Sequence, residues 1–115
     1  MKINSNNLIA EFMGFVNTTP TDKDFNIYQN KEGKMIETMS MEYSTSWDWL
    51  MPVVEKIELM GYNVICTPMS TMDGWHCSIE SYNEPWNGTD SIDDTKILAI
   101  FNSVVQFIKY YNENK

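Results

Sequence analysis

One stretch of the chain changes its hydrophobic period, and this change limits the possible folds more than any other feature. Apolar residues recur at helical spacing between residues 46 and 60, and Gly61 follows where a helix C-terminus favours glycine. Apolar and polar residues then alternate in residues 62–67 and again in residues 75–81, which predicts a half-buried antiparallel hairpin. Pro52 removes one helical hydrogen bond, so we expect the regular helix either to begin near it or to bend there. The apolar stripe of this helix consists of Trp47, Leu50, Val54 and Ile57, with Met51 and Val53 beside it.

The two cysteines face each other in the register that best matches this hairpin. With Cys66 opposite Cys77, Val64 falls opposite Ile79, so all four side chains share one face. We expect that face to be the core face. A reducing cytosol favours two reduced core thiols, and the alternatives are a strained cross-strand disulfide or, with less support, a metal site.

The N-terminal part of the chain predicts a short helix and a first hairpin. The helix spans about residues 7–13, with Gly14 at its C-terminus. The hairpin joins residues 25–29 to residues 34–39 through the turn 30–33. The expected register pairs Gln29 with Lys34, Tyr28 with Met35, Ile27 with Ile36 and Phe25 with Thr38.

The C-terminal segment predicts a last helix over about residues 93–110, with Ser91 and Asp94 resembling a capping box. The element order is then α-ββ-α-ββ-α. A mostly antiparallel four-stranded sheet packed with helices buries the apolar stripes economically, so the fold class is α+β, an α/β sandwich. At 115 residues the whole chain, 1–115, is expected to form one domain.

The charge balance is strongly acidic and restricts the partners. Sixteen acidic and eight basic residues give a formal net charge of −8, which disfavours direct nucleic-acid binding. The acidity serves either solubility or docking onto a basic protein partner. We find no secretion signal and no apolar run near the roughly 18 residues of a membrane span, so we expect a cytoplasmic protein without a membrane partner.

The residue supply argues against an enzyme. The chain has one histidine and two cysteines, and His76 and Cys77 point to opposite faces of a strand because they are neighbours. Phosphate-loop, nucleophile-elbow and zinc-protease motifs are absent from the sequence. Acidic residues near the last helix could hold a hard cation, but helix capping explains two of them, Asp93 and Asp94. We therefore expect no catalytic residue, no cofactor and no metal.

Aromatic residues around the second hairpin are the best candidates for contacts with a partner or ligand. Trp75 shares the face of Cys77 and is expected in the core, whereas Trp86 lies in a Pro-Trp-Asn-Gly loop. Trp47 and Trp49 lie about 200° apart on a helix, so one should be buried and the other partly exposed. The predicted contact residues are Trp86, Tyr82, His76, Glu84 and Trp49.

Four segments resemble a known family. Residues 9–15 (IAEFMGF), 43–45 (YST), 52–58 (PVVEKIE) and 95–101 (TKILAIF) are similar to the small phage proteins of the phage ABA sandwich domain family. The chain departs from the family pattern at Phe15, where tryptophan is usual, and in a longer insert before the YST segment. The resemblance implies a phage or prophage origin and an α/β sandwich, and it carries no functional residue onto this chain.

Two functional hypotheses follow. The first is a non-enzymatic phage accessory protein that binds a host or phage protein, with anti-defence inhibition as one such role. The alternative is a protein that binds and sequesters a small molecule such as a nucleotide signal, which a deep pocket lined by lysine and aromatic side chains would favour. Homo-oligomerisation is also expected, through sheet edges and the adaptable side chains of Met35, Met39 and Met41.

Overall fold

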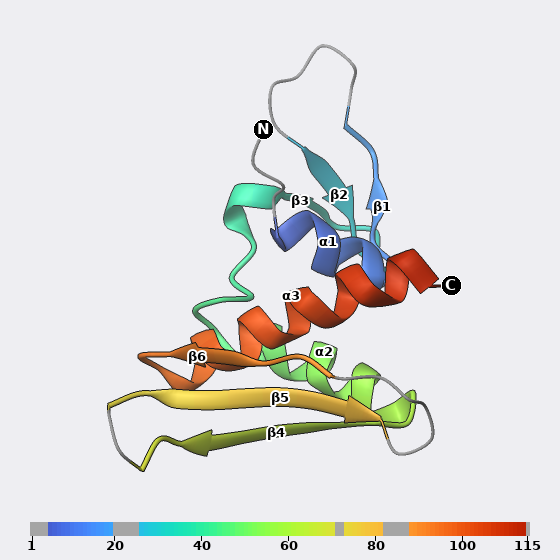
Figure 1. Cartoon of the computed structure of the whole chain (residues 1–115). Coiled ribbons are helices and arrows are strands. Elements are labelled where there is room, and N and C mark those ends of the chain that lie inside the picture. The colour runs from blue at the N-terminus through green and yellow to red at the C-terminus, as the bar shows by residue number, and fades with distance from the viewer. Residues whose placement is uncertain (1–4, 20–25, 71–72, 82–87, 115) are drawn as a thin grey trace. The chain divides into compact units, whose positions relative to one another are not determined.

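The computed structural model describes residues 5–19, 26–70, 73–81 and 88–114, and it has an α+β architecture (Figure 1). The chain divides into two compact units, Met1–Glu42 and Tyr43–Lys115. The expected single domain stays a prediction. Among the described residues, the strands form two antiparallel three-stranded sheets, with orders β1-β2-β3 and β4-β5-β6.

The first unit combines one helix with the smaller sheet. Its elements are α1 (Ser5–Phe12), β1 (Val16–Asn17), β2 (Ile27–Gln29), β3 (Met35–Glu37) and the 3₁₀ helix η1 (Thr38–Ser40). Helix α1 ends where expected, because Gly14 has φ +89° and its N–H donates to the Glu11 carbonyl while the Phe15 N–H donates to that of Ala10. The buried Tyr28 hydroxyl of β2 donates to Glu11 Oε2 at 2.5 Å.

The first hairpin has a register one residue away from the predicted one. Tyr28 pairs with Ile36 and Gln29 with Met35. The Asn30 and Lys34 backbones close the turn at 3.0 Å, and Asn30 Oδ1 accepts the Lys34 N–H at 2.9 Å, so the loop is one residue shorter than predicted. Phe25 lies outside the described residues.

The predicted methionine surface of this unit is only partly correct. Met35 and Met39 are 56% and 82% exposed, whereas Met41 is buried. Met41 therefore belongs to the core and not to a contact surface.

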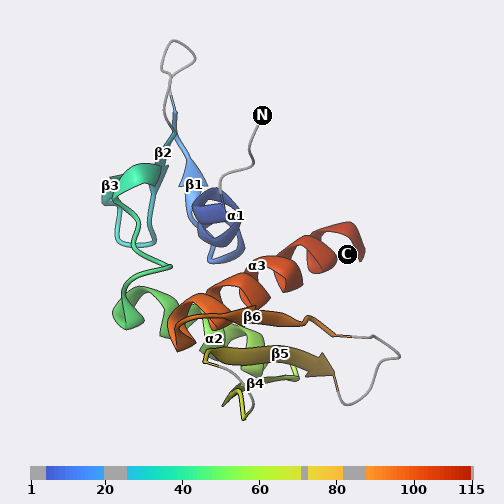
Figure 2. The same cartoon turned by 60° about the vertical axis from the view of Figure 1, so that its left-hand side comes forward.

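The second unit places two helices on one face of the larger sheet (Figures 1 and 2). Its elements are α2 (Trp47–Leu59), β4 (Tyr62–Pro68), β5 (Trp75–Ser81), β6 (Ser91–Asp93) and α3 (Lys96–Asn114). The register of the second hairpin is confirmed, because Cys66 pairs with Cys77 and Val64 with Ile79. The core of this unit consists of Tyr43, Leu50, Val53, Val54, Ile57, Cys77, Ile79, Ala99, Ile100, Val104, Val105, Phe107 and Ile108.

The helix predicted over about residues 46–60 is confirmed as α2, whereas a start near Pro52 and the burial of Trp47 were wrong. The helix begins at Trp47, with Ser46 as its N-cap, and it continues through Pro52, which lies on the exposed side. Trp47 is 41% exposed, so the predicted apolar stripe is buried only from Leu50 onward.

The prediction of a single four-stranded sheet was wrong, because the described strands form two three-stranded sheets. In the second unit, Ser91 begins the strand that was not predicted, β6. Its hydroxyl donates to the Ala99 carbonyl at 2.6 Å and lies 2.9 Å from the Ser103 hydroxyl, which in turn donates to the Cys77 carbonyl at 3.0 Å. These bonds hold Ser91 in strand β6 beside β5, so it does not cap the last helix. Helix α3 begins at Lys96, and the Thr95 hydroxyl accepts the Leu98 N–H at 3.3 Å.

Candidate functional site

A pocket of about 480 Å³ opens between α2, β4 and α3, and we name it the helix pocket. Three elements contribute side chains to it, each at the residue spacing of its secondary structure. Helix α2 presents every third or fourth residue, β4 every second residue, and α3 two residues one turn apart. The lining residues are Trp47, Met51, Val54, Glu58, Val64, Cys66, Lys96 and Ile100.

The pocket lies over β4 because the helices cover the sheet unevenly. On the inner face of β5, Cys77 and Ile79 are completely buried. On the same face of β4, their partners Cys66 and Val64 remain partly exposed. The space above β4 is therefore open to a ligand, and at its rim Trp47 and Met51 are 41% and 40% exposed.

The two charged residues of the lining lie toward opposite ends of the helix pocket. Helix α2 turns at Gly61 directly into β4, so Glu58 of α2 lies at the end near Val64. Lys96 lies toward the other end of β4, where Trp75 pairs with Pro68, and its charge lowers the pKa of Cys66, the next inward residue of that strand. Lys96 Nζ also stands 5.3 Å from the centre of the Trp75 ring.

The paired cysteines are free thiols. Burial raises the pKa of Cys66, and a hydrogen bond from Cys77 and the charge of Lys96 only partly oppose this effect. Burial also raises the pKa of Cys77 to about 12, against an opposing hydrogen bond with Ser103. Both thiols therefore keep their protons at neutral pH, which makes them poor nucleophiles.

The raised pKa of Cys77 predicts a loss of stability at alkaline pH. In the unfolded chain the thiol ionises above about pH 9, whereas in the folded protein it stays protonated to about pH 12. Above pH 9 the unfolded state therefore binds fewer protons than the folded state. The contribution of the buried Cys77 thiol to the free energy of unfolding is complete below pH 9 and falls by up to about 1.4 kcal/mol per pH unit above it. We expect urea titrations of Cys77→Ala to show a shallower decline over this range than the wild type.

A residual decline should remain in Cys77→Ala, because burial also raises the pKa of Tyr43 to about 12. An unchanged slope in the variant would show that Cys77 does not titrate with folding.

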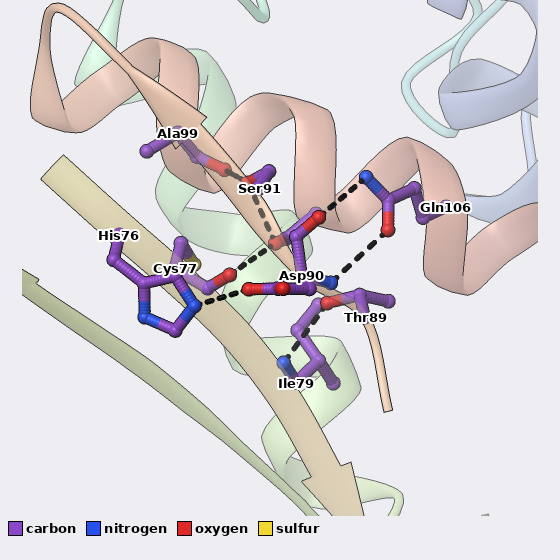
Figure 3. A network of polar contacts seen from close by, with 9 residues as sticks. His76, Cys77, Ile79, Thr89, Asp90, Ser91, Ala99 and Gln106 are labelled. Carbon is purple, nitrogen blue, oxygen red and sulfur yellow. Dashed lines mark hydrogen bonds and ion pairs between the residues drawn. The ribbon is translucent and has the colours of Figure 1, made fainter. Parts of the chain in front are cut away.

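A second cluster of polar contacts holds residues 89–91 between β5 and α3 (Figure 3). The Ile79 N–H donates to the Thr89 hydroxyl at 3.0 Å, and the Asp90 N–H donates to Gln106 Oε1 at 3.2 Å. Asp90 Oδ1 contacts His76 Nε2. This histidine and carboxylate lie on the outer face of the sheet, because Cys77 and Ser91 next to them point inward. The cluster joins β5 to α3, and within it the His76 ring contacts a carboxylate and not a thiol.

The structure describes two of the five predicted contact residues, His76 and Trp49. His76 contacts Asp90, and Trp49 is half-buried with its ring edge-on to Tyr43 at 5.1 Å. Tyr82, Glu84 and Trp86 lie outside the described residues.

Sequence reasoning missed the helix pocket. The stripe of Trp47, Met51 and Val54 was visible as a helical pattern, but it was assigned to the core because a helical period does not say what covers it. Nothing in the sequence marked Lys96 as a pocket residue, since its approach to β4 depends on how α3 crosses the sheet.

Within the described part of the chain, histidine, cysteine, aspartate and glutamate side chains nowhere gather in groups of three or more that could hold a metal ion. No helix among the described residues has the length and apolar character needed to cross a membrane. Comparison with protein-family models, with curated proteins and with solved structures gives no match.

Proposed function

We propose that the protein is a small, non-enzymatic accessory protein of phage or prophage origin that acts in the host cytoplasm by binding another protein. The origin rests on the resemblance described above. The binding role is supported by one observation above all, the exposure of Trp47 and Met51 at the rim of the helix pocket. Tryptophan and methionine are enriched in protein interfaces, and tryptophan is among the commonest hot-spot residues.

Charge defines the kind of protein partner that this surface suits. The exposed side of α2 carries Asp48, Glu55 and Glu58 beside the two apolar residues. The whole chain has a formal net charge of −8. A partner with a basic surface and one protruding apolar side chain would match both features, since opposite potentials accelerate association and orient the two surfaces. Inhibition of a host defence protein is one role that such binding could serve.

Replacing Trp47 with alanine is expected to weaken partner binding about tenfold or more, because it removes the largest side chain at the rim. The matched control is Leu59→Ala on the same helix, since Leu59 is 89% exposed and does not line the helix pocket. Tagged wild type and both variants would be used to capture proteins from host lysate, with quantitative mass spectrometry as the readout.

The expected result is a protein that the wild type and Leu59→Ala retain and that Trp47→Ala loses. Its capture should also weaken as salt is raised. Equal capture by all three chains, or capture insensitive to salt, would contradict docking at this surface.

Binding of a small molecule is a second candidate function, because the helix pocket has both an aromatic residue and a lysine in its lining. Its volume falls within the range of about 300–1,000 Å³ that is typical of ligand pockets. A nucleotide with several phosphates fits it poorly, however. Among the described lining residues Lys96 is the one cation, and Glu58 adds a negative charge.

A further inference from the structure

We propose that the helix pocket binds a small molecule with an apolar body and a single carboxylate, which pairs with Lys96. This inference rests on the second candidate function and names its ligand class. The two proposed sites share Trp47 and Met51, but ligand binding is measured on the purified chain and is therefore tested without the protein partner.

The apolar body is specified by the walls. Met51 and Val54 of α2 face Ile100 of α3 across a floor that includes Val64 of β4. These side chains offer no charge and no strong hydrogen-bonding group. A hydrocarbon ligand body makes no hydrogen bonds with water, so it would lose none on entering the pocket. The removal of its apolar surface from water would favour binding.

The carboxylate is specified by Lys96 and its surroundings. Lys96 is the first residue of the 19-residue helix α3, where the helix dipole favours an anion. No ion pair joins it to a carboxylate anywhere in the described residues, and Asp93 nearby is engaged by Asn102 at 2.7 Å. Trp75 beneath the ammonium group leaves its charge unneutralised. Lys96 is itself exposed, so an anionic group in the pocket would replace part of the water around its ammonium group.

The single charge follows from the rest of the electrostatic environment. Glu58 lies on the same pocket lining, toward the end away from Lys96. The chain as a whole carries a formal net charge of −8. A second anionic group on the ligand would meet repulsion without a second cation, so the chemistry favours a monoanion.

The test compares three probes on the purified full-length chain by isothermal titration calorimetry and ligand-observed NMR. Octanoate has the body and the charge, 1-octanol has the body alone, and acetate has the charge alone. We expect octanoate to bind more tightly than octanol by about threefold to fivefold, the gain of one solvent-exposed ion pair, and acetate to show no binding.

Two variants assign the effect to Lys96. Lys96→Gln should weaken octanoate binding about threefold to fivefold and leave octanol binding unchanged. Lys109→Gln should change neither, because Lys109 is exposed like Lys96 and belongs to the same helix but does not line the pocket. Met51→Glu places a like charge at the rim and should also weaken octanoate selectively. Circular dichroism checks that each variant is folded.

Absence of octanoate binding, equal binding of octanoate and octanol, or an unchanged affinity in Lys96→Gln would each overturn the inference. None of these results would affect the protein-binding proposal, whose assay depends on capture of a partner by Trp47. Conversely, a failure to capture a partner would not change the interpretation of the octanoate measurements.

Discussion

Replacing Phe107 with alanine is expected to lower the free energy of unfolding of the second unit by about 3–5 kcal/mol. Phe107 of α3 is completely buried, and its ring meets Tyr62 edge-on at 4.7 Å and stacks with Tyr111 at 6.1 Å. Alanine would remove both ring contacts and leave a cavity that the surrounding helix and sheet can close only in part. Urea unfolding followed by near-ultraviolet circular dichroism would measure the loss.

The matched control is Phe101→Ala in the same helix. Phe101 is only half-buried, so its removal should cost less than about 2 kcal/mol. Similar losses for the two variants would mean that Phe107 is not the packing centre of this unit, and that the ring contacts around it do not persist in solution.

Replacing Gly88 with alanine is expected to have the second largest effect, a loss of about 2–5 kcal/mol. Gly88 has φ +79°, and a Cβ atom there would lie 2.8 Å from the Ile79 carbonyl oxygen. That oxygen already accepts the Thr89 N–H at 3.2 Å, so backbone in β5 would have to move and break this bond. Thermal unfolding monitored by circular dichroism would report the change.

Gly61→Ala separates the two causes of this loss. Gly61 has φ +99°, but a Cβ atom there meets nothing within 4 Å. Its variant carries only the cost of a left-handed residue, about 1–2 kcal/mol. A Gly88→Ala variant no less stable than Gly61→Ala would show that residues 88 and 89 do not pack against β5 as described.

The second hairpin was predictable because its register is set by local pattern. Alternation along two strands of seven residues places Val64, Cys66, Cys77 and Ile79 on one face, and a slip of one residue would move all of them to the solvent side. The first hairpin has strands of only three residues, and the side-chain bond from Asn30 closes its turn. Pattern matching over so short a ladder could not select between adjacent registers.

The third strand of each sheet was not predictable from period or propensity. Ser91 resembled a helix cap because serine followed by aspartate suits that role, yet its hydroxyl bonds reach Ala99 and Ser103 in the following helix. Strands β1 and β6 have two and three residues. Such short segments carry no periodicity, and only their neighbours make them strands.

The sequence by itself determined the α+β class, the glycine-terminated helices and the pairing of Cys66 with Cys77, because these depend on periodicity, backbone freedom and nearest neighbours in the chain. Only the tertiary structure decided that Trp47 stays exposed and that Trp47 and Lys96 line the same pocket. The pocket lies between α2, β4 and α3, and the spacing of two helices over a sheet depends on side chains far apart in the sequence.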